Sequence, residues 1–63
     1  MYKQTYVVFD SRNNYAVAHV WDDENGEQQV DVLEVLFAKN TRDAIVETRN
    51  LGIALTHKYA LPI

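Results

Sequence analysis

Residues 15–37, YAVAHVWDDENGEQQVDVLEVLF, contain the pattern that decides the fold. The first eight of them alternate bulky and small side chains, which is the two-residue period of a strand. Asn25 and Gly26 follow, and both residue types accept the positive φ that a type I′ hairpin turn requires. We therefore predict strands over residues 15–22 and 30–38, joined by a two-residue loop that places Trp21 opposite Val30 and His19 opposite Val32. In this register His19 and Asp31 lie on different faces.

The flanking sequence predicts two further strands and a helix. Residues 2–9 are rich in β-branched and aromatic side chains and predict a strand, and DSRNN at 10–14 predicts a turn. A four-residue loop over residues 11–14 would place Phe9 beside Ala16. Asn40 or Thr41 can cap a helix that carries Asp43 in its first turn and ends at Gly52. Residues 53–61 alternate again and predict a fourth strand, which Pro62 ends because it lacks an N–H.

These elements predict one α+β domain over residues 1–63, with the order strand-strand-strand-helix-strand. We expect an antiparallel sheet of three to four strands with one helix on one face. Ala44, Thr48 and Leu51 form the apolar stripe of the helix, whereas Val46 points to solvent. The sheet face expected beneath the helix consists of Val7, Phe9, Ala16, Ala18, Leu33, Val35 and Phe37, with the two alanines forming a trough.

The composition excludes several classes of function. The 63 residues include no cysteine and only two histidines, His19 and His57, without ligand-like spacing. Disulfides and thiolate metal sites are therefore excluded. No phosphate-binding loop or catalytic motif is present, so we expect no enzyme activity, catalytic residue, cofactor or metal. The start of the chain does not resemble a signal peptide and no apolar run could span a bilayer, so a cytoplasmic protein is expected.

The acidic residues are concentrated around the predicted hairpin tip. Six of the nine acids lie between Asp22 and Glu34, and the net charge is −3. With a pI near 5.1, nucleic-acid binding is disfavoured. The tip is either a solvated turn or a charged surface that steers the chain to a basic target, for example by imitating the spacing of phosphates. Its residues are Asp22, Asp23, Glu24 and Glu27.

The sheet face away from the helix is the predicted contact surface. A large apolar patch on a small monomer usually marks an interaction site, and Trp and Tyr are enriched in interface hot spots. The alternative is that the sheet curls and closes this patch internally. The residues predicted to bind a partner are Tyr6, Tyr15, Val17, His19, Trp21, Val30 and Val32 on the sheet, with Asp22, Asp23, Glu24 and Glu27 at the tip.

The segment FAKNTRDAIVETRNLGIALTHKYALPI, residues 37–63, resembles small phage-encoded inhibitor proteins. The shared plan is a strand ending in Phe37-Ala38, a polar cap at Asn40-Thr41, an Asp43-Ala44 step, a helix and a closing strand. This resemblance implies a compact, non-enzymatic protein that occupies a surface of a larger host protein, in the host cytoplasm, and it carries over no functional residue. The alternatives are a homodimeric structural or regulatory module and a single-stranded nucleic-acid binder.

Overall fold

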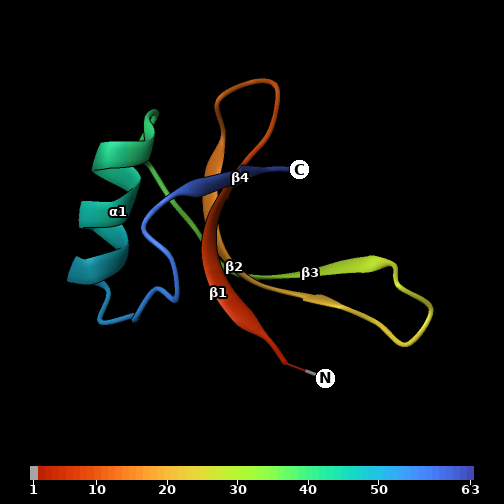
Figure 1. The fold of residues 1–63 in the computed structure, drawn as a ribbon. Helices are drawn as coiled ribbons and strands as arrows, with labels where there is room; N and C mark the ends of the chain where they lie inside the picture. The colour runs from red at the N-terminus through yellow and green to blue at the C-terminus, as the bar shows by residue number, and fades with distance from the viewer. Residues whose placement is uncertain (1) are drawn as a thin grey trace.

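Residues 2–63 are described in the computed structural model, and they form four strands and one helix (Figure 1). The predicted α+β class and the order of elements along the chain are confirmed. The strands lie in one sheet in the order β3-β2-β1-β4. The elements are β1 (Gln4–Phe9), β2 (Tyr15–Asp22), β3 (Gln28–Val35), α1 (Thr41–Asn50) and β4 (Ala60–Pro62).

The sheet is mixed, so the prediction of an entirely antiparallel sheet was wrong. β1 pairs antiparallel with β2 but parallel with β4. The reason is that a helical crossover connects strands of the same direction. Because β3 and β1 are both antiparallel to β2, the chain that leaves β3 through α1 re-enters the sheet parallel to β1. β4 is also much shorter than predicted, although the preceding segment stays beside β1, where Thr56 N–H donates to the Thr5 carbonyl at 3.0 Å.

Both hairpin loops contain three residues, which shifts both predicted registers. Asp23 N–H donates to the Glu27 carbonyl at 2.9 Å, so the tip loop is Glu24, Asn25 and Gly26, with φ of +79° at Gly26. This is a turn followed by a left-handed residue rather than a type I′ turn. In the first hairpin Phe9 lies opposite Tyr15, whereas a four-residue loop would have placed it beside Ala16.

The second hairpin contains a β-bulge that partly restores the predicted pairing. Near the tip Trp21 lies opposite Gln29 and His19 opposite Asp31, so the predicted partners Val30 and Val32 were wrong. His19 and Asp31 therefore share a face, contrary to the prediction. Between Val17 and Ala18 the register shifts and leaves Leu33 without an opposite residue. From that point the pairing follows the predicted register.

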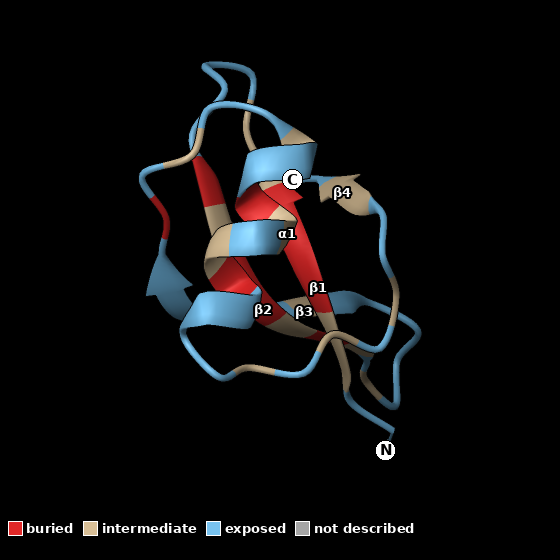
Figure 2. Cartoon of the chain, turned by 90° about the vertical axis from the view of Figure 1, so that its left-hand side faces the viewer, coloured by how far each residue is buried: buried red, intermediate tan, exposed pale blue. Residues whose placement is uncertain are grey.

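α1 is positioned on the sheet by its caps and by small side chains. The Asn40 side chain accepts from Asp43 N–H, and Gly52 continues the chain with φ of +77° after the helix, as predicted. Ala44 and Thr48 are completely buried, whereas Val46 is exposed as expected. The side of α1 that faces the sheet is buried and its outer side is exposed (Figure 2). Leu51, expected on the buried stripe, is 48% exposed.

The sheet face beneath α1 is the odd-numbered face of β2, opposite to the prediction. Ala44 packs in one cluster with Val7, Tyr15, Val17 and Leu36. The alanine trough is therefore not beneath the helix. Of the side chains predicted there, Val7 and Phe9 do belong to this cluster, whereas Ala16 and Ala18 contribute to the opposite face. Leu33, Val35 and Phe37, also predicted there, are exposed.

A second apolar cluster fills the sheet face away from α1. It consists of Tyr6, Val8, Ala18 and Val20, with Leu61 of β4 packed against it. The β2–β3 arm and β4 both extend to the side away from the helix, so the sheet curves around this cluster (Figure 1). The predicted open face is therefore partly closed by the sheet itself.

Candidate functional site

Three of the predicted partner-binding residues are buried by other parts of the chain. Tyr15 and Val17 are under α1 with 7% and 0% exposure, and Tyr6 is 8% exposed on the opposite face. For Tyr15 and Val17 the cause is the one-residue register shift, which exchanges the two faces of a strand. Tyr6 remains on the face where it was predicted and is buried there by the C-terminal segment, with His57 and Tyr59 against its ring. Tyr15 and Val17 could reach a partner only if the fold opened, so the prediction that their side chains lie on an exposed face was wrong.

His19 and Trp21 lie on the same face as Tyr15, but farther along β2 than the helix reaches. Both are half-buried. The Lys3 ammonium lies 4.4 Å from the centre of the Trp21 ring, a cation–π geometry. Trp21 therefore has an intramolecular partner at the start of the chain.

Five of the ten large apolar side chains that are exposed within residues 2–63 follow β3 and the segment after it. Val30 and Val32, both predicted as partner residues, are exposed here, and three further side chains extend the row. β3 is an edge strand, so this row lies at the border of the sheet. Together the edge row comprises Val30, Val32, Leu33, Val35 and Phe37, of which Val30 is the least exposed at 37% and Phe37 the most exposed at 90%.

Phe37 is held in place by a contact that the sequence did not suggest. The Glu47 carboxylate on α1 accepts from Phe37 N–H at 2.9 Å and from Ala38 N–H at 2.9 Å. The preceding residue, Leu36, is 4% exposed and packs in the core. The backbone is thus fixed on both sides of a ring that points to solvent. The predicted strand extended to residue 38 and so included Phe37 and Ala38. In the structure β3 ends at Val35, and the N–H groups of these two residues bind Glu47 instead.

The backbone of β3 is also available at the sheet edge. In an antiparallel ladder, successive residues direct their N–H and C=O groups alternately to the two sides. Because Asp23 N–H donates to the Glu27 carbonyl, the backbone groups of Glu27 and of every second residue after it on the arm face β2. The backbone groups of Gln28, Val30 and Val32 therefore point away from β2, toward the free edge. The same residues carry the side chains on the face away from α1, opposite Ala18 and Val20.

The acidic tip divides into one structural and three solvent-facing residues. Asp22, Glu24 and Glu27 are exposed. Asp23 instead accepts from Glu27 N–H and Asn25 N–H, both at 2.9 Å, and from the Gln29 amide at 2.9 Å. These hydrogen bonds, with that from Glu27 first, hold the pKa of Asp23 below its usual value. Asp23 therefore shapes the loop, while the other three carboxylates remain free for a partner.

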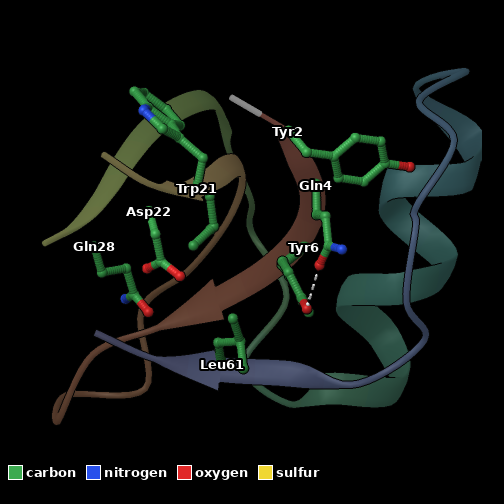
Figure 3. A pocket seen from close by; sticks show the side chains of 8 residues that line it. Tyr2, Gln4, Tyr6, Trp21, Asp22, Gln28 and Leu61 are labelled. Atoms are coloured by element: carbon green, nitrogen blue, oxygen red, sulfur yellow. Dashed lines mark hydrogen bonds between the residues drawn. The ribbon is translucent and has the colours of Figure 1, made fainter. Parts of the chain in front are cut away.

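A hollow of about 270 Å³ opens on the face away from α1 (Figure 3). It is lined by Tyr2, Gln4, Tyr6, Val20, Trp21, Asp22, Gln28 and Leu61. The Gln4 side-chain oxygen accepts from the Tyr6 hydroxyl at 2.8 Å and lies 3.1 Å from His57 Nε2. A hydrogen bond with Tyr59, followed by burial, raises the pKa of Tyr6 above its ordinary value.

The Gln4 and Tyr6 side chains in the lining of this hollow connect β1 to the C-terminal segment. The His57 ring is stacked on Tyr6 at 4.8 Å and joined to Gln4, so it serves to attach the C-terminal segment to β1. Across residues 2–63, no three acidic or histidine side chains are grouped to hold a metal ion. The edge row is the better candidate for a site.

The described residues contain no helix with the length and apolarity needed to cross a membrane. No protein-family model, curated protein or solved structure matches this chain, so its function must be inferred from its own surface.

Proposed function

We propose that the chain is a non-enzymatic protein-binding protein that occupies a surface of a larger host protein in the cytoplasm. A phage or mobile-element inhibitor or accessory factor is the type of protein that this implies. The observation that carries the proposal is the edge row, in which five apolar side chains stay exposed along one border of the sheet. Exposed apolar side chains gathered in one region of a small protein usually mark an interaction site.

Phe37, at the end of the edge row, is the expected anchor of this interface. Complete burial of an exposed phenylalanine contributes about 1.5–3 kcal/mol. The hydrogen bonds that Phe37 N–H and Ala38 N–H donate to Glu47 already fix the backbone, so less conformational entropy is lost when a partner covers the ring. Val35, 72% exposed, lies two residues away and extends the same surface.

The exposed carboxylates of the tip favour a partner with a basic surface. Asp22, Glu24 and Glu27 lie at the far end of the β2–β3 arm from Phe37. Charges at the rim of an interface mainly accelerate association and select among partners. A role as a single-stranded nucleic-acid binder has less support, because buried Tyr6 and Tyr15 offer no stacking platform.

Quantitative affinity purification tests the proposal. The bait is the chain itself, used with a lysate of the cells in which its gene occurs, and recovered proteins are compared by isotope labelling. The test variant is Phe37→Ser, and the matched control is Val46→Ser, which alters an exposed apolar residue on α1. We expect a protein that is recovered with the unaltered chain and the control but lost with Phe37→Ser. Equal recovery with all three baits would contradict the proposal.

A further inference from the structure

We infer that the partner contributes an extended segment that pairs antiparallel with the free edge of β3, with side chains that alternate between apolar and basic. This inference rests on the proposed function and specifies how the same edge row would be used. Addition of a strand to an exposed sheet edge is a general mode of recognition, in which main-chain hydrogen bonds supply affinity and side chains supply specificity.

The free backbone groups of β3 define where the segment would pair. Gln28, Val30 and Val32 direct their N–H and C=O groups toward the edge, as the ladder alternation requires. A segment residue opposite Val30 would exchange two hydrogen bonds with it. Its side chain would then lie beside Val30 on the face away from α1, where an apolar residue is favoured.

The other face of β3 defines the charge of the segment. Asp31 and Gln29 lie on the α1 side of the sheet, and Glu34 lies opposite Val17 on that same side. Segment residues opposite Asp31 form a pair without direct hydrogen bonds, in which side chains approach most closely. A lysine or arginine there would form an opposite-charge pair with Asp31, whereas an acid would be repelled.

The acids also make a second copy of this chain an unfavourable occupant. In a two-fold antiparallel pairing, Val30 opposite Val32 of the second copy places the two Asp31 residues opposite each other. Val30 opposite Val35 of the second copy places Asp31 opposite Glu34. The register centred on Val30 avoids these contacts but sets Val32 against Gln28. Each copy carries a net charge of −3, which adds general repulsion.

Titration of the isotope-labelled chain with synthetic peptides, followed by NMR, tests the inference. The probe is a peptide of alternating valine and lysine. We expect amide shifts and slowed hydrogen exchange at Val30 and Val32, and affinity at least about tenfold weaker when glutamate replaces lysine. N-methylation of the valines should abolish pairing, because their N–H groups face β3. N-methylation of the lysines should leave it intact. Asp31→Lys should reverse the preference between the two charged peptides.

Three results would overturn strand addition. They are the absence of shifts at millimolar peptide, equal binding of the two N-methylated peptides, and equal binding of the lysine and glutamate peptides. If one of these results is found and Phe37→Ser still loses the natural partner, the chain binds a protein but not by strand addition. If the Phe37→Ser bait instead recovers the same proteins as the unaltered chain, the proposed function is contradicted, whatever the peptide titration shows.

Discussion

Asp10 and Asp23 occupy equivalent positions in the two hairpin loops and make the same hydrogen bonds. Asp10 Oδ1 accepts from Arg12 N–H at 2.8 Å and Asn14 N–H at 3.0 Å. Asp23 Oδ1 accepts from the residues two and four positions later in the same way. The residue three positions after each aspartate, Asn13 or Gly26, has a positive φ. DSRNN and DENGE are thus two sequences for one loop geometry.

The acid dependence of stability should come partly from these two aspartates. Hydrogen bonds, first from Asn14 and first from Glu27 respectively, lower the pKa of Asp10 and Asp23 below the ordinary value in the folded chain. A depressed folded-state pKa gives stabilisation that is present above the unfolded value and is lost as pH falls through the folded one. We expect melting temperature to drop below about pH 4, and the drop to be smaller in Asp10→Asn and Asp23→Asn. Asp22→Asn, exposed on β2, is the control, and equal pH profiles for all variants would exclude this role.

The left-handed loop positions should distinguish glycine from other residues. Gly26 has φ of +79°, and a Cβ atom added there would meet no neighbouring atom, so Gly26→Ala is strained by the backbone conformation alone. We expect a loss of about 1–2 kcal/mol in the free energy of unfolding. Asn13→Gly at φ of +60° should stay within about 0.5 kcal/mol of the unaltered chain. Urea denaturation measures both, and a stable Gly26→Ala variant would argue against the loop geometry.

Ala44 should tolerate no larger side chain. It is completely buried against Val7, Tyr15 and Val17. Ala44→Leu should reduce the free energy of unfolding by about 1–3 kcal/mol through overpacking. Val46→Lys, on the exposed side of α1, should be nearly neutral. Equal losses in thermal denaturation would show that the helix is rotated about its axis relative to this packing.

Glu47 should stabilise the segment between β3 and α1. Its carboxylate accepts hydrogen bonds from Phe37 and Ala38. Glu47→Ala should cost about 1–3 kcal/mol and accelerate amide exchange at those two residues, while exchange within the β1–β2 pairing is retained. Glu24→Ala at the hairpin tip serves as the control for loss of one acid. Unchanged exchange at Phe37 in Glu47→Ala would mean that another group holds this backbone.

The contact between Lys3 and Trp21 should be measurable by a double-mutant cycle. An exposed cation–π pair contributes about 0.5–1 kcal/mol. We therefore expect Lys3→Ala to lower the free energy of unfolding by this amount in the unaltered chain. In a chain that carries Trp21→Leu, Lys3→Ala should have no such effect. Lys58→Ala provides a control for removal of a lysine elsewhere. An identical effect of Lys3→Ala in both backgrounds would indicate that the two side chains act independently.

The elements could be predicted from the sequence because their signals are local. The cap at Asn40, the stop at Gly52 and the β-branched run before Asp10 each depend on a few neighbouring residues. Loop length was harder to predict, because Asn25-Gly26 is compatible with a two-residue turn and with the end of a three-residue loop. The aspartate before each loop was the available signal, since its carboxylate can close the longer loop.

The errors about the candidate site follow from these two loops. A difference of one residue in register exchanges the faces of a strand, so Tyr15 and Val17 moved beneath the helix. The bulge at Leu33 had no signal in the local sequence. The contact of Phe37 and Ala38 with Glu47 joins residues of different elements, which no local pattern encodes. Val30 and Val32 were nevertheless predicted as surface residues, and they are exposed.

The short strand β4 has a consequence for how many molecules can assemble. It borders the sheet on the side opposite β3, spans three residues and includes Pro62, which cannot donate a main-chain hydrogen bond. A sheet with two receptive borders can grow from molecule to molecule into a fibril. The sheet formed by residues 2–63 has one receptive border, so growth stops after a single addition. We therefore expect complexes of defined one-to-one stoichiometry, in spite of the apolar row that the chain leaves exposed.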